Sequence, residues 1–134
     1  MELTERLSVK TSRRQEMIDI TPRVNEALRK AGARDGICVI FVTHTTAGVT
    51  INENADPAVG ADIEAGLDRI APEGAGYRHA EGNSPAHIKS TVVGPSITVP
   101  VAGGRLTLGT WQSVFLCEFD GPRTRTAVVS FIKG

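Results

Sequence analysis

The densest run of chemically active side chains in this sequence is residues 44–56, which read H-T-T-A-G-V-T-I-N-E-N-A-D. The run follows directly on the apolar stretch 37–42, I-C-V-I-F-V. A buried strand that ends in such a polar run is a place where a domain presents side chains for binding or catalysis. We therefore take His44 and Glu53 as candidate catalytic residues. The candidate binding residues of the same run are Thr45, Thr46, Asn52 and Asp56.

The chain has three histidines, His44, His79 and His87, and each lies in a polar segment. Three imidazoles with an open fourth position are typical of a catalytic metal site, with Zn²⁺ or Mg²⁺ as the candidate ions. The spacing matches no compact metal motif, so three unrelated surface histidines are the alternative.

The two carboxylates of the run have different explanations. Asp56 precedes Pro57, which is a helix-start signal, so Asp56 has a sufficient role as an N-cap. Glu53 lies before the capping positions and is free to hold a cation or act as a base. The N–H groups at the start of this helix favour a phosphate nearby, and carboxylates beside an anion imply a bridging cation.

A second polar stretch, G-N-S-P-A-H at 82–87, also combines a helix start with unexplained polar groups. Ser84 as N-cap and Pro85 at the first helical position account for two of its residues. Asn83 and His87 are left without a structural role, so we take Asn83 as a binding candidate and His87 as a catalytic one.

Further candidates come from the last third of the chain. Trp111 lies in an expected strand, where tryptophan is usually core, and its neighbour Gln112 should face the other side. One of the two would then border a cavity and contact a heterocycle. Arg123 and Arg125, at the last turn, suit phosphate binding, although a solvated hairpin tip explains them equally well.

Elements that would position these residues are readable from local patterns. We expect a strand over 7–11 with a short partner at 17–20, and a helix capped by Thr21 and ended by Gly32. The apolar run 37–43 predicts a central strand covered on both faces. A second helix after Asp56 would bury Ile63, Leu67 and Ile70.

The rest of the chain predicts a short helix over 86–93, then three strands at 97–101, 106–119 and 126–132 in an antiparallel meander. The glycines at 103–104 predict a two-residue hairpin turn. With no linker or repeat, residues 1–134 read as one domain. The fold class is α+β, with a mixed, largely antiparallel, curved sheet and helices on one face.

Composition and charge narrow the range of possible functions. Fifteen Lys and Arg balance fifteen Asp and Glu, which disfavours a nucleic-acid partner. No stretch approaches the ~20 apolar residues of a membrane span, and residues 1–6 lack a signal-peptide core. Cys38 and Cys117 lie in apolar runs and are expected to be buried free thiols in a cytoplasmic protein.

Four stretches together resemble the YjbQ-like family, which is described as a secondary thiamine-phosphate synthase family. They are F-V-T-H-T-T-A-G-V-T-I-N-E-N-A-D-P at 41–57, Y-R-H-A-E-G-N-S-P-A-H-I-K at 77–89, G-P-S-I-T-V-P-V at 94–101 and G-R-L-T-L-G-T-W-Q-S-V-F-L-C-E-F-D-G-P-R at 104–123. The similarity covers nearly the whole chain.

The resemblance implies a sheet curled into a half-barrel, a homotrimer, and condensation of hydroxymethylpyrimidine diphosphate with a thiazole phosphate to release pyrophosphate. A small phosphorylated molecule would then be the partner. The family's polar cluster falls on His44, Thr45, Thr46, Asn52, Glu53, Asp56, His79, Asn83, His87 and Gln112. Two other hypotheses remain: a module that binds a metal or phosphorylated ligand without turnover, and a trimeric assembly protein.

Overall fold

The computed structural model of the chain describes residues 2–134, with side chains from residue 4 onward. Strands and helices are mixed along it, as the sequence predicts. In chain order they are β1 (Glu2–Lys10), β2 (Glu16–Asp19), α1 (Thr21–Lys30), β3 (Gly36–Val42), β4 (Ala47–Glu53), α2 (Pro57–Ile70), α3 (Ser84–Val93), β5 (Ser96–Ala102), β6 (Arg105–Leu106), β7 (Gln112–Glu118) and β8 (Thr124–Lys133).

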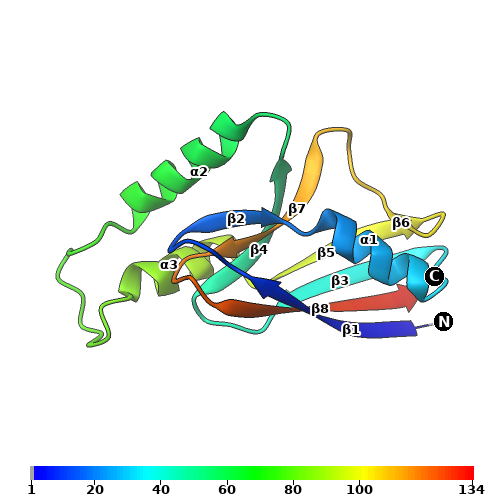
Figure 1. The fold of residues 1–134 in the computed structure, drawn as a ribbon, viewed down its shortest axis with the longest axis horizontal. Coiled ribbons are helices and arrows are strands. Elements are labelled where there is room, and N and C mark those ends of the chain that lie inside the picture. Colours follow the sequence, from blue (N-terminus) through cyan, green and yellow to red (C-terminus); the bar gives the residue numbers. More distant parts are fainter. Residues whose placement is uncertain (1) are drawn as a thin grey trace.

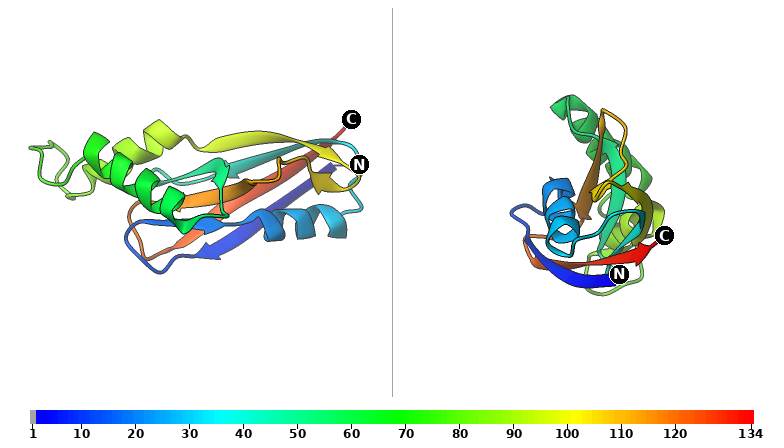
Figure 2. Two further views of the ribbon diagram at one scale, coloured as in Figure 1. Left: turned by 90° about the horizontal axis from the view of Figure 1, so that it is seen from above. Right: turned by 90° about the vertical axis from the view of Figure 1, so that its right-hand side faces the viewer.

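The strands form two antiparallel sheets (Figure 1). One has five strands in the order β1-β8-β3-β5-β6, and the other has three in the order β2-β7-β4. The two sheets enclose the main hydrophobic core, and α1 lies at the side between them (Figure 2), where Val24 and Leu28 enter that core. This arrangement confirms the expected α+β half-barrel.

Helices α2 and α3 cover the other face of the three-stranded sheet. Side chains on β7 alternate between the two cores: Val114 and Leu116 enter the main core, while Phe115 and Cys117 pack under α2 and α3. The strand buried on both faces is therefore β7 and not β3.

The prediction that both faces of the strand at 37–43 are covered is wrong. Cys38, Ile40 and Val42 are buried, but Ile37 and Phe41 are 40% and 44% exposed on the outer face of the five-stranded sheet. No helix of the described chain packs on that face. A continuous apolar run shows that both faces are apolar, but it does not identify what covers each face.

Three predicted pairings and boundaries are also wrong. Strand 17–20 does not pair with the first strand, because β2 pairs with β7 while β1 pairs with β8. The predicted strand 106–119 is interrupted at 107–111, and its halves β6 and β7 belong to different sheets, so there is no C-terminal meander. For the pairings the cause is that the partners lie far apart in sequence, so no local pattern specifies them.

Helix starts are predicted better than pairings. Asp56 caps α2, and its Oδ1 accepts a hydrogen bond from the Ala58 N–H at 2.9 Å. The cap of α1 is Ile20 rather than Thr21, whose hydroxyl instead accepts the Val114 N–H at 2.7 Å. The positive φ of Gly32 ends α1 as expected.

Three smaller expectations also have outcomes. The N-cap of α3 is Asn83, one residue before the expected Ser84. On α2, Leu67 is buried, but Ile70 is 59% exposed and so is not part of the expected buried stripe. The hairpin turn at 103–104 joins β5 to β6 as predicted. Over residues 2–134, no helix has both the length and the apolar character that a membrane crossing requires.

Candidate functional site

The predicted site residues divide into two groups at opposite ends of β4. His44, Thr45 and Thr46 precede this strand, whereas Asn52 and Glu53 are its last residues. Seven residues of extended strand span about 20 Å, so the two groups do not meet within one copy of the chain.

The first group lies where three segments distant in sequence come together: the β3–β4 loop, the start of α3 and the β7–β8 turn (Figure 1). We call this the His44 cluster. Its members, joined by hydrogen bonds or charge, are His44, Thr46, Asn83, Glu118, Asp120, Arg123 and Arg125. Thr45 lies exposed at its edge. His87 lies one turn after Asn83 on α3, and His79, in the loop before α3, packs against His87.

A buried ion pair between Glu118 and Arg125 forms the floor of the His44 cluster, with both side chains at most 2% exposed. The Thr11 hydroxyl donates to Glu118 Oε1 at 2.7 Å. Arg125 Nη2 donates to Thr46 Oγ1 at 2.8 Å and to the Thr46 carbonyl at 3.0 Å. The ion pair therefore holds the loop that carries His44.

Burial by itself raises the pKa of Glu118. The hydrogen bonds from Arg125, the Asp120 N–H and Thr11 outweigh that effect, so the pKa lies below its ordinary value of 4.5. Glu118 is therefore a carboxylate at neutral pH, paired with a permanently charged guanidinium.

His44 is held in one orientation by the backbone. Its Nε2 accepts a hydrogen bond from the Thr126 N–H at 2.8 Å, which places the imidazole proton on Nδ1. Burial, followed by the charges of Arg125 and Arg123, lowers its pKa from 6.5, against an opposite effect of Glu118. His44 is thus a neutral imidazole that presents an Nδ1–H donor.

Asn83, Asp120 and Arg123 form a second layer of the His44 cluster. Asn83 Nδ2 donates to Asp120 Oδ2 at 2.9 Å, and Arg123 Nη2 donates to the same oxygen at 2.7 Å. Asn83 therefore has a structural role that the sequence did not suggest, because it joins the start of α3 to the β7–β8 turn. Its Oδ1 is buried and has no hydrogen-bond partner within the described residues. An unpaired buried acceptor is costly, so this oxygen is a candidate acceptor for a donor from outside these residues.

His79 and His87 lie side by side, with ring centroids 5.3 Å apart and planes nearly perpendicular. His79 Nε2 lies 4.0 Å from Glu81 Oε2. Across residues 2–134 of one copy, no three His, Cys, Asp or Glu side chains are grouped so that they could hold a metal ion. A metal site that joins these two histidines to His44 stays a prediction.

The second group is more dispersed. Asn52 Oδ1 accepts the Glu53 N–H at 2.8 Å at the end of β4, and Gln112 Oε1 accepts the Gly109 N–H at 2.8 Å in the turn before β7, so both amides bond to the local backbone. Trp111 is 65% exposed in the loop before β7, which makes the expectation of a core tryptophan wrong. Glu53 and Asp56 line an open hollow with Arg13 and Phe115.

Sequence reasoning missed Glu118, and it left Arg125 as either a phosphate-binding residue or part of a solvated hairpin tip, whereas the two form a buried ion pair. The signal for Glu118 was an acid in the apolar run 114–119, V-F-L-C-E-F, because a charge in a buried strand requires a partner. The signal for Arg125 was strand alternation: it lies on the same face of β8 as Ala127, Val129 and Phe131, which are buried.

The comparisons with known proteins place the chain in a class. The family model of the UPF0047 protein YjbQ-like family matches residues 5–134. The chain belongs to this family, which confirms the resemblance read from the motifs.

Particular relatives support the same assignment. The chain is 51% identical over 124 residues to a UPF0047 protein of Methanocaldococcus jannaschii, covering 92% of this chain and 90% of that one. It is 51% identical over 127 residues to the UPF0047 protein YugU of Bacillus subtilis, covering 94% and 96%. A crystal structure of a YbjQ-like protein of unknown function from Sulfolobus solfataricus superposes with a TM-score of 0.95 at 34% identity, covering 100% and 99%. These descriptions state no activity.

Proposed function

We propose that the His44 cluster binds a small phosphorylated molecule and that the chain is a subunit of a secondary thiamine-phosphate synthase. The observation that carries this is the convergence of a neutral imidazole, a guanidinium and an unpaired carboxamide oxygen from three distant segments. Family resemblance supplies the reaction.

In that reaction the methylene carbon of the pyrimidine forms a bond to the thiazole nitrogen while its bond to a diphosphate oxygen breaks. Both electrons of the broken bond leave with pyrophosphate, so negative charge develops on the leaving oxygens. Donors preorganised around those oxygens lower the barrier.

The His44 cluster offers such donors. Arg123 is half exposed and uses Nε and Nη2 on Asp120, which leaves Nη1 to donate to a diphosphate. His44 offers Nδ1–H, and His87, a half-buried imidazole one turn after Asn83 on α3, is a further candidate donor. Asn83 Oδ1 would accept an N–H from the amino group of the pyrimidine.

The proposal includes a homotrimer, because Glu53 and Asp56 can reach the His44 cluster only from a neighbouring copy. Ile37, Phe41 and Ile132 form an exposed apolar strip on the five-stranded sheet, a surface suited to association. The expected native mass is three times 14.2 kDa by light scattering. Phe41→Lys should lower the native mass, whereas Val92→Lys, at a 55% exposed position on α3, should leave it unchanged. A monomeric wild type, or an unchanged mass for Phe41→Lys, contradicts this.

A resident divalent ion does not fit the residues of a single copy. His79 and His87 provide two imidazoles, one fewer than the three protein ligands of a catalytic zinc site. No step above depends on a metal. A Mg²⁺ or Zn²⁺ site completed by a neighbouring copy is a separate proposal. It predicts metal that survives dialysis in the wild type and is lost in His79→Ala, and metal-free wild-type protein contradicts it.

The reaction is tested by supplying purified protein with hydroxymethylpyrimidine diphosphate, thiazole phosphate and Mg²⁺ and measuring thiamine phosphate. We expect product above the protein-free rate, and a loss of about 10²-fold in His87→Ala. Thr91→Ala is the matched control, since this exposed residue lies one turn further along α3. If the wild type forms no product, or His87→Ala matches Thr91→Ala, the enzymatic proposal is wrong. Ligand binding without product would indicate a binding module.

A further inference from the structure

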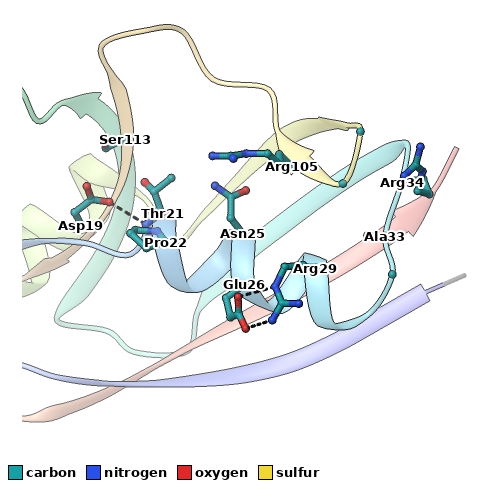
Figure 3. A pocket seen from close by; sticks show the side chains of 13 residues that line it. Asp19, Thr21, Pro22, Asn25, Glu26, Arg29, Ala33, Arg34, Arg105 and Ser113 are labelled. Carbon is teal, nitrogen blue, oxygen red and sulfur yellow. Dashed lines mark hydrogen bonds and ion pairs between the residues drawn. The ribbon is translucent and has the colours of Figure 1, made fainter.

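A second site is suggested by the groove between α1, the β5–β6 hairpin and the start of β7 (Figure 3). Its volume is about 770 Å³, within the range of small-molecule sites. The groove lies away from the His44 cluster, because its residue Ser113 pairs with Asn52 at the far end of β4. Three arginines and two carboxylates line it: Arg29, Arg34, Arg105, Asp19 and Glu26.

Both carboxylates of the groove are already occupied by neighbouring groups. Asp19 Oδ1 accepts the Thr21 N–H at 2.9 Å, and Asp19 Oδ2 accepts Asn54 Nδ2 at 2.7 Å. The two oxygens of Glu26 accept Nε and Nη2 of Arg29 at 3.0 and 2.6 Å. Glu26 therefore neutralises one arginine, and each oxygen of the two acids already accepts a hydrogen bond. Asp19 keeps its negative charge because its donors are neutral, so the three arginines and two acids leave a net positive charge in the groove.

The groups that remain are donors. Asn25 Oδ1 accepts the Leu106 N–H at 3.0 Å, which orients the amide and leaves Nδ2 free. Thr21 Oγ1 accepts the Val114 N–H at 2.7 Å, so its own proton is available. The ion pairs of the described residues do not include Arg34 or Arg105. Figure 3 shows the Arg105 side chain reaching across the groove above Asn25, toward Thr21.

We infer that this groove binds a phosphate monoester or diphosphate of a small polar molecule, independently of the His44 cluster. The phosphate lies between the Arg105 guanidinium, Asn25 Nδ2 and the Thr21 hydroxyl, three kinds of donor that suit a tetrahedral anion with several acceptors. Arg34, at the hairpin end of the groove, faces a second acidic group of the same molecule. The unpaired guanidinium charge favours an anion over a neutral ligand.

The test is a titration of ¹⁵N-labelled protein with inorganic pyrophosphate at constant ionic strength, with calorimetry for affinity. The groove predicts shifts of the Asn25 side-chain amide and of the backbone amides at 103–105. Arg105→Gln should weaken this binding about tenfold or more, the effect of losing a charge-assisted hydrogen bond. Arg69→Gln, an exposed arginine on α2, is the matched control and should bind like the wild type.

Asn25→Asp is a second test variant, which should preserve the fold. The aspartate keeps an acceptor for the Leu106 N–H but replaces the free Nδ2 donor with negative charge, so pyrophosphate binding should fall at least as far as in Arg105→Gln. Glu26→Gln removes a charge that pairs with Arg29 and should tighten binding. Equal affinity of Arg105→Gln and Arg69→Gln overturns the inference. The inference is also overturned if pyrophosphate shifts no amides, or shifts only those of residues 79–87 and 118–126. In the second case the His44 cluster would be the anion site.

Discussion

Replacing Glu118 by glutamine should destabilise the chain severely, because Arg125 would keep its charge in a site from which water is excluded. The side chains are 0% and 2% exposed, so solvent cannot compensate the lost partner. Breaking a buried ion pair on one side costs about 3–5 kcal/mol. That is a large part of the roughly 5–15 kcal/mol that stabilises a typical domain.

Urea unfolding followed by circular dichroism measures this loss at a fixed protein concentration. With a slope of about 2 kcal/mol per molar urea, Glu118→Gln should lower the midpoint by about 2 M. Glu73→Gln is the matched control, since its ion pair with Arg14 is 2.6 Å long but about 60% exposed on both sides. The control should lose at most about 1 kcal/mol.

A double substitution separates pairing from size. Glu118→Leu combined with Arg125→Met removes both charges and should recover much of the stability lost in Glu118→Gln. A loss below about 1 kcal/mol in Glu118→Gln, or a control as destabilised as it, would refute the argument that this pair holds the Thr46 loop.

Three further predictions concern pH, packing and thiol reactivity. Because the folded pKa of Glu118 lies below 4.5, its contribution to stability is present above pH 4.5 and is lost as the pH falls through the folded pKa. The urea midpoint of Glu118→Gln should therefore depend less on pH in the acidic range than that of the wild type. An equal pH dependence of the two midpoints would contradict this. Gly48→Ala would place Cβ 2.7 Å from the Gly94 carbonyl oxygen and should cost about 1–3 kcal/mol in melting experiments, whereas Gly66→Ala, with open space around it, should not destabilise. Burial raises the pKa of Cys38 to about 11, so the thiol should resist Ellman's reagent at pH 8 until the protein unfolds; rapid labelling of the folded protein would contradict its burial.

Helix positions were largely predictable because their signals are local. Asp56-Pro57 identifies the start of α2 because the cap and the fixed proline φ act within one turn. Gly32 identifies the end of α1 in the same way. Strand partners were not predictable: β1 pairs with β8 across more than 100 residues, and the choice depends on which apolar faces meet.

The candidate site was predictable residue by residue but not as an arrangement. His44, Asn83 and Arg123 were identified from residue type, and the fold brings them into one cluster. Glu53 was placed with them because it is close in sequence, but an extended strand of seven residues carries it to the other end of the sheet. Glu118 was overlooked in the sequence. A charge in an apolar strand indicates that a partner exists, but only the tertiary structure shows that the partner is Arg125.

The most direct test of the His44 cluster as the functional site is a crystal structure of the protein soaked with hydroxymethylpyrimidine diphosphate. We expect the diphosphate within hydrogen-bond distance of Arg123 and His44 Nδ1, with Asn83 Oδ1 accepting from the pyrimidine amino group. A diphosphate bound solely in the α1 groove, or found at neither place under saturating conditions, would contradict the proposed role of the His44 cluster.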